Sequence, residues 1–205
     1  MSFNTLASNE IQTKTAEALR VKGYEVYEVE TGADALEKIK TLIPKDASLM
    51  NGSSRTLEQI GFVNLLKTGK HEWNNLHDAI IAEKNPDKQA ELRKQSVLSD
   101  YYLGSVHALS ETGEFIIASA SGSQLPHIVF TSQNLIFVVG AQKIMPTLDE
   151  ARHRVKEYVF PLEDKRMKEA GYSGSMIAKE LIFHGELVAM GRKINVILVN
   201  ESLGF

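Results

Sequence analysis

The alternation of helical and extended segments in the first quarter of the chain restricts its fold more than any other feature. Apolar residues recur at helical spacing over 8–21 and over 31–43, and an alternating pattern typical of a strand lies between them at 24–29. A short apolar run at 47–50 follows Pro44, which ends the second helix. Helices that alternate with strands build a largely parallel sheet with helices on its faces, so we predict an α/β fold.

The rest of the chain continues this pattern and adds a hairpin. The turn cluster 110–114 separates two apolar runs and predicts antiparallel strands. The run 135–139 is typical of a buried central strand, and a helix is predicted from 148 to about 160, where Pro161 ends or kinks it. Further predictions are short helices at 125–130 and 163–170 and strands at 180–183, 187–190 and 194–199.

Residues 67–99 are predicted to form an excursion from this core. The segment 67–75 is polar and holds Trp73, the only tryptophan, which indicates a loop or a flap that covers a cleft or contacts a partner. Residues 76–98 have helical spacing interrupted at Pro86, which opens a second helix. At 205 residues, the whole chain (1–205) is expected to be one domain.

Composition narrows the function classes. The chain has no cysteine, which excludes disulfides, thiolate-held metal or iron–sulfur sites and a cysteine nucleophile. A net charge of −3 and the lack of a basic stripe argue against nucleic acid as a partner. The apolar runs are too short to span a bilayer, so we expect no membrane insertion. The first residues do not have the basic segment followed by an apolar segment that is typical of a signal peptide, so we expect a cytoplasmic location.

The turn that follows the run 47–50 is the strongest candidate for a binding site. A helix start and small side chains let an anion approach the backbone, and Arg55 adds a fixed charge. The alternative is an ordinary strand-to-helix turn in which a serine caps the helix and Glu58 closes a capping box. The residues predicted to bind an anion are Asn51, Gly52, Ser53, Ser54, Arg55 and Thr56.

A second loop and one lysine are further binding candidates. The loop after the hairpin offers hydrogen-bonding groups in Ser121, Gly122, Ser123 and Gln124, or is merely a tight link. Lys143 follows the central strand, where ligands sit in open α/β sheets, so it faces an anion or is a solvated loop residue.

Two residues near the hairpin are candidates for catalysis. His107 precedes the hairpin turn and could act as a general base, although a lone histidine is more often structural. Glu111 lies in the turn and could act as a nucleophile, although a glutamate in a polar turn is more often solvated. The other histidines show no spacing typical of a metal site, and we predict none.

Four blocks of sequence resemble the LUD (lactate-utilization) domain family, which includes the C subunit of the bacterial lactate-oxidation complex. They occur in the family's order and cover nearly the whole chain: 51–61 (NGSSRTLEQIG), 99–114 (SDYYLGSVHALSETGE), 138–146 (VVGAQKIMP) and 196–205 (VILVNESLGF). One departure is clear, because many members have Asp-Gly-Thr-Gly-Asn-Arg where this chain has 119–124 (SASGSQ). Any role of that Asp and Arg therefore does not carry over.

The resemblance implies a Rossmann-like, three-layer open sheet of the type shared by ribose-5-phosphate isomerase and CoA transferases, with a hairpin excursion. It implies a protein that binds a small anionic metabolite and is an accessory component of organic-acid utilisation. Iron–sulfur or flavin cofactors would then belong to partner oxidoreductase subunits and not to this chain. Whether the chain is an enzyme stays open. The alternatives are a stand-alone isomerase, acyl-transfer or ligase-type enzyme, or a non-catalytic binding or assembly module, and self-association is expected.

Overall fold

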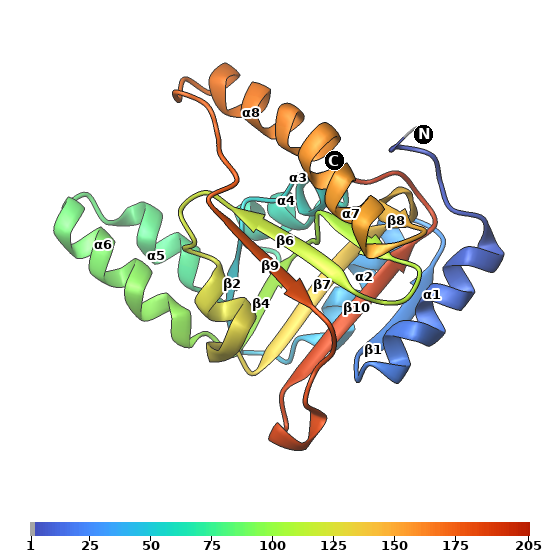
Figure 1. Ribbon diagram of the computed structural model, residues 1–205. Helices are drawn as coiled ribbons and strands as arrows, with labels where there is room; N and C mark the ends of the chain where they lie inside the picture. Colours follow the sequence, from blue (N-terminus) through green and yellow to red (C-terminus); the bar gives the residue numbers. More distant parts are fainter. Residues whose placement is uncertain (1–2) are drawn as a thin grey trace.

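The computed structural model describes residues 3–205, and its centre is a six-stranded sheet whose pairings are all parallel (Figure 1). This confirms the predicted α/β class. Because neighbouring parallel strands end at the same edge, the segments that follow them are brought together there. The strand order is β1 (Glu25–Val29), β10 (Lys193–Val199), β7 (Asn134–Gly140), β4 (Tyr101–Gly104), β2 (Ser48–Asn51) and β3 (Asn74–Asn75).

Three helices cover one face of this sheet: α2 (Gly32–Leu42), α3 (Arg55–Gln59) and α4 (Phe62–Thr68). Thr31 caps α2, and its side chain and that of Asp34 form a capping box. The apolar residues of the helices meet alternate residues of β7, Ile136 and Val138, in one buried cluster.

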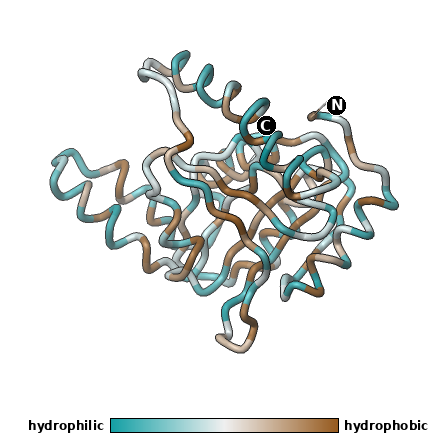
Figure 2. Tube along the Cα trace, in the orientation of Figure 1, coloured by the Kyte–Doolittle hydropathy of each residue, from teal (hydrophilic) through white to brown (hydrophobic). Residues whose placement is uncertain are grey.

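The other residues of β7, such as Phe137, face helix α1 (Asn9–Val21) and a second sheet. Helix α7 (Leu148–Arg154) packs on the outer side of that second sheet. Figure 2 shows hydrophobic residues concentrated in the central strands. The second sheet contains the predicted hairpin and has the order β8 (Ile144–Met145), β5 (Ala108–Ser110), β6 (Phe115–Ser119) and β9 (Lys179–Phe183).

The excursion at 67–99 consists mainly of helices α5 (Leu76–Ala82) and α6 (Pro86–Gln95) and the short turn η1 (Ser96–Leu98). The segment before them is not a free flap. The indole of Trp73 packs against Phe62 and donates a hydrogen bond of 3.2 Å to the carbonyl of Ile43. Within residues 3–205, no helix is long and apolar enough to cross a membrane.

Two predictions near the C-terminus need correction. Of the two predicted effects of Pro161, ending the helix is wrong, because the π turn η4 (Val155–Val159) precedes it and the helix continues as α8 (Phe160–Glu169). A π turn shifts the register of hydrogen bonds, so the missing N–H of the proline is accommodated. Residues 187–190 form an exposed turn, η5 (Val188–Met190), and not a strand. Elsewhere in the chain, the predicted short helix at 125–130 corresponds to the π turn η2 (His127–Thr131). A short 3-10 turn, η3 (Ala141–Lys143), follows β7.

Candidate functional site

A pocket of about 560 Å³ lies at the edge of the sheet where β2, β4 and β7 end. The segments that follow these strands line it, together with the loop after β6, helix α8 and the segment after α8. This is the position where open α/β sheets bind ligands. The structure therefore brings together the turn after residue 51 and the loop at 119–124, which lie far apart in the sequence.

Lys143 lies at the floor of this pocket and is almost fully buried, with 3% of its surface exposed. Its ammonium group donates three hydrogen bonds, to Thr56 Oγ1 at 3.1 Å, Ser105 Oγ at 3.0 Å and the carbonyl of Val106 at 3.1 Å. The two hydroxyls in turn donate to backbone carbonyls, Ser105 to Val138 at 2.6 Å and Thr56 to Leu203 at 3.3 Å. Both hydroxyls are therefore oriented as acceptors toward the lysine.

The charge of Lys143 has no counterion. No carboxylate of residues 3–205 forms an ion pair with it, and the second buried cation nearby, Arg154, donates to the carbonyls of Phe3 and His107 and lies over the ring of Tyr158. Burial, and then repulsion from Arg154, lowers the pKa of Lys143 to about 7. The pocket floor thus holds excess positive charge at and below neutral pH.

Two glycines that line the pocket lie close against neighbouring side chains, one of them at the floor. A Cβ atom on Gly204, which has a φ of +72°, would lie 2.4 Å from Thr56 Oγ1 and 3.1 Å from Lys143 Nζ. A Cβ on Gly52 would lie 2.4 Å from the hydroxyl of Tyr102. No side chain fits at either position without displacing these neighbours.

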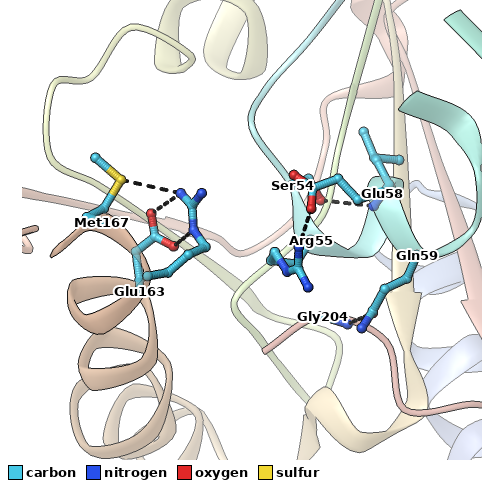
Figure 3. A network of polar contacts seen from close by, with 9 residues as sticks. Ser54, Arg55, Glu58, Gln59, Glu163, Met167 and Gly204 are labelled. Carbon is cyan, nitrogen blue, oxygen red and sulfur yellow. Dashed lines mark hydrogen bonds and ion pairs between the residues drawn. The ribbon is translucent and has the colours of Figure 1, made fainter. Parts of the chain in front are cut away.

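Most of the turn at 51–56 lines the pocket, and one of its serines caps a helix, as in the alternative interpretation of an ordinary strand-to-helix turn. Ser54 uses its hydroxyl to cap α3, accepting from the amide of Leu57 at 3.3 Å, and Arg55 forms an ion pair of 2.5 Å with Glu58 (Figure 3). Helix α3 has only five residues, so its end contributes little field. Gly52 and Ser53 line the pocket and Thr56 supports Lys143, whereas Asn51 is buried outside it and donates to the carbonyl of Gly52.

The loop at 119–124 faces this turn. Ser121, Ser123 and Gln124 line the pocket, and Gly122 does not. The amide of Gln124 is already engaged, because its oxygen accepts from the hydroxyl of Tyr102 at 3.3 Å and its nitrogen donates to the carbonyl of Ala118. Ser121 and Ser123 are exposed and bonded to each other at 3.1 Å, so they remain available to a ligand.

His107 lines the pocket, but the ring nitrogen that could accept a proton, Nδ1, is already occupied by a hydrogen bond, which is unfavourable for a general base. Its Nδ1 accepts from the backbone amide of Ala118 at 3.2 Å, which puts the proton of the neutral ring on Nε2. Burial, then the charges of Lys143 and Arg154, lower the pKa of His107 to about 4. At neutral pH the free nitrogen is therefore a hydrogen-bond donor.

The acidic residues of the hairpin turn lie outside the pocket. Glu111 forms an ion pair of 2.9 Å with Lys14 of α1 and does not line the pocket. Glu114 is bound by Lys22, Ser110 and Thr112, and although burial acts to raise its pKa, these hydrogen bonds outweigh it and lower the pKa to about 2. Both carboxylates fasten the hairpin to α1 or to itself. No group of three His, Asp or Glu side chains in residues 3–205 is arranged to hold a metal.

Sequence reasoning missed one wall of the pocket, which α8 and the segment after it provide. The charge run at 163–168 has the mixed pattern of a solvated helix face, yet Glu163 and Arg166 line the pocket. They form a bidentate ion pair with both distances 2.7 Å, and Glu163 and Met167 lie across from Ser54 and Arg55 in Figure 3. The signal that could have revealed this wall is the large apolar residues, such as Tyr172 and Met176, in an otherwise polar stretch.

The LUD domain family matches residues 12–199 of this sequence. The chain belongs to the LUD domain family. In the structural comparison, a DUF162 family protein from Deinococcus radiodurans is 14% identical and aligns with a TM-score of 0.57 over 96% of this chain and all of that one. At this identity the likeness shows a shared fold alone. Ribose 5 phosphate isomerase A from Neisseria gonorrhoeae is 13% identical, with a TM-score of 0.41 over 85% of this chain and 94% of that one. The curated proteins contain no match.

The four blocks that carry the likeness to the LUD domain surround the pocket. Thr56 lies in the first, Ser105 in the second, Lys143 in the third and Gly204 in the fourth, where it follows the residues 12–199 that the family matches, and the structure joins all four at the floor. The LUD domain is associated with lactate utilisation, so membership relates this chain to that process.

Proposed function

We propose that this LUD domain binds a small anionic metabolite, with its carboxylate at the pocket floor, and is an accessory component of organic-acid utilisation. The observation that carries the proposal is the buried ammonium of Lys143, which lines the pocket and has three neutral partners but no carboxylate in the described chain. A buried cation without a counterion is costly, and a bound anion would relieve that cost.

The distribution of the other charges supports this position for the anion. Arg55 and Arg166 both line the pocket, and each is neutralised by a glutamate of its own helix. Lys143 is the pocket-lining cation without such a partner among residues 3–205. Ser121 and Ser123, at the pocket edge, offer hydroxyls to the remainder of the ligand.

The accessory role follows from what the chain can supply. Oxidation of a hydroxy acid requires an electron acceptor, and a chain without cysteine cannot bind a thiolate-held iron–sulfur cluster. In this proposal the redox centre, iron–sulfur or flavin, belongs to a partner subunit, and this chain binds the acid or a related anion.

Binding is tested by the shift in melting temperature on addition of sodium salts of acetate, lactate, pyruvate and phosphate at pH 6.5. Wild-type protein is expected to be stabilised by at least one of these anions relative to sodium chloride. Lys143→Met removes the positive charge that pairs with the anion and is expected to weaken binding about 10- to 150-fold. Lys84→Met, at an exposed lysine outside the pocket, is the matched control and should behave like the wild type. Equal shifts in both variants would place the anion elsewhere.

The accessory role has a separate test. Purified protein is incubated with lactate and a dye that accepts electrons, and lactate consumption is measured. No turnover is expected from the chain alone. Sustained turnover that is lost in Lys143→Met would overturn the accessory role and favour a self-sufficient enzyme.

A further inference from the structure

The pocket has two chemically different sides. Its floor is polar and cationic, formed by Lys143, Thr56 and Ser105. The opposite wall, contributed by the helix α8 region and the segment after it, is largely apolar. Its apolar members are Val159, Phe160, Met167, Tyr172, Met176 and Ile177.

Two of these wall residues are exposed to an unusual degree. Tyr172 has 64% and Met176 has 61% of its surface exposed, although both are large and apolar and both line the pocket. They are held there by a specific contact, because Asp164 of α8 accepts a hydrogen bond of 2.8 Å from the amide of Ser175. Gly174, with a φ of +119°, permits this turn, since a Cβ there would lie 2.4 Å from the carboxylate of Asp164. The segment is therefore shaped to present apolar side chains to the pocket.

The volume of the pocket exceeds what a small acid fills. On the scale of about 30 Å³ for one water, the six heavy atoms of an acid the size of lactate fill less than a third of the 560 Å³. A ligand whose carboxylate reaches Lys143 and that also contacts Tyr172 and Met176 needs further apolar atoms.

We infer that the site takes a carboxylate that carries an apolar chain, with the carboxylate at Lys143 and the chain against the wall of Tyr172 and Met176. This inference rests on the proposed anion site and names its ligand class. A chain in this position covers apolar surface that is otherwise exposed to water, which favours longer acids over shorter ones.

The test is a titration of wild-type protein with straight-chain carboxylates from acetate to octanoate, read by calorimetry at pH 6.5. Each added methylene is expected to tighten Kd by about two- to fourfold until the wall is covered. Primary alcohols of the same lengths should bind far more weakly, because they lack the charge that pairs with Lys143.

Two variants distinguish binding at the wall from non-specific hydrophobic binding. Met176→Ser and Tyr172→Ser change exposed side chains, so both should fold, and both should flatten the dependence on chain length while keeping the affinity for acetate. Met190→Ser is the matched control, since Met190 is 69% exposed but lies outside the pocket, and it should keep the full dependence.

The outcomes distinguish this inference from the proposed function. Binding of short acids with no gain for longer ones, or an unchanged gain in both wall variants, would overturn the inference and leave the anion site standing. Alcohols that bind as well as acids would overturn the requirement for the carboxylate head. If no acid of any length binds, the proposed function fails and the inference fails with it.

Discussion

The floor and the wall of the pocket are built in opposite ways. The floor residues Thr56 and Lys143 are buried, lie in the short helical segments α3 and η3 that follow strands of the central sheet, and share one hydrogen-bonded network. The wall residues Tyr172 and Met176 are exposed, follow the last turn of a peripheral helix and depend on contacts such as that of Asp164 with Ser175. The position of the charge is thus fixed by the core of the fold, whereas a peripheral segment contributes to the shape of the pocket.

The same difference explains why excess charge is tolerated at the floor. A cation in an exposed loop would simply be solvated, whereas the packing of the core buries Lys143 and so removes water from its charge, which costs free energy. Its three hydrogen bonds compensate only part of the lost hydration, and burial with Arg154 nearby therefore lowers its pKa. The proposed binding of an anion would give a reason for the arrangement.

The largest contrast in stability is expected from two glycine substitutions. Gly204→Ala places a Cβ 2.4 Å from Thr56 Oγ1 on a backbone with positive φ, and overpacking with backbone strain should cost about 2–5 kcal/mol, lowering Tm by roughly 5–15 °C. Gly171→Ala has a φ of +89° but no atom within 4 Å of the new Cβ, so it should cost about 1 kcal/mol. Thermal unfolding measures both. Equal losses would show that the floor is no more constrained than the segment after α8.

The second contrast concerns the charge of Lys143 without any ligand. The pKa of Lys143 is lower in the folded protein, about 7, than its ordinary value of 10.5, so folding opposes its protonation. Lys143→Met should therefore be more stable than the wild type at pH 6, by about 1–4 kcal/mol. As pH rises from about 7 toward 10.5, Lys143 loses its proton in the folded wild type but keeps it in the unfolded chain. The wild type is therefore stabilised as pH rises, and the stability advantage of Lys143→Met should shrink. Urea unfolding at pH 6 and pH 9 measures it, and an advantage that is constant across this range would contradict the depressed pKa.

The sequence predicted the parallel sheet and one side of the pocket, and the reasons are local. Alternating helical and strand periodicity is encoded within short windows, so β1, α2 and β2 could be placed closely, and Lys143 could be assigned to the edge of the sheet because it follows a buried strand. Its burial and its missing counterion could not be predicted, since they depend on Thr56, Ser105 and Arg154 converging from distant segments.

The wall escaped prediction for a different reason. Its apolar side chains are spread over a helix and an irregular segment and follow no single period, while Glu163 and Arg166 have the pattern of a solvated helix face. Pro161 also suggested a boundary where the π turn lets the helix continue. The role of His107 was likewise hidden, because the contact of its Nδ1 with Ala118 depends on how the hairpin folds back on residue 107.

The smallest expected effect tests whether the wall is separable from the core. Asp164→Ala removes the acceptor of the Ser175 amide, so residues 171–177 should exchange their amide hydrogens faster, while Tm changes by less than about 2 °C. Hydrogen exchange followed by mass spectrometry measures this segment against the central strands. Lys168→Met is the control, since it removes the other partner of Asp164, at 2.6 Å, but keeps the contact with Ser175. Because Tyr172 and Met176 are exposed, faster exchange should stop at this segment. If it extends into β7, the wall and the floor form one cooperative unit and the contrast between them fails.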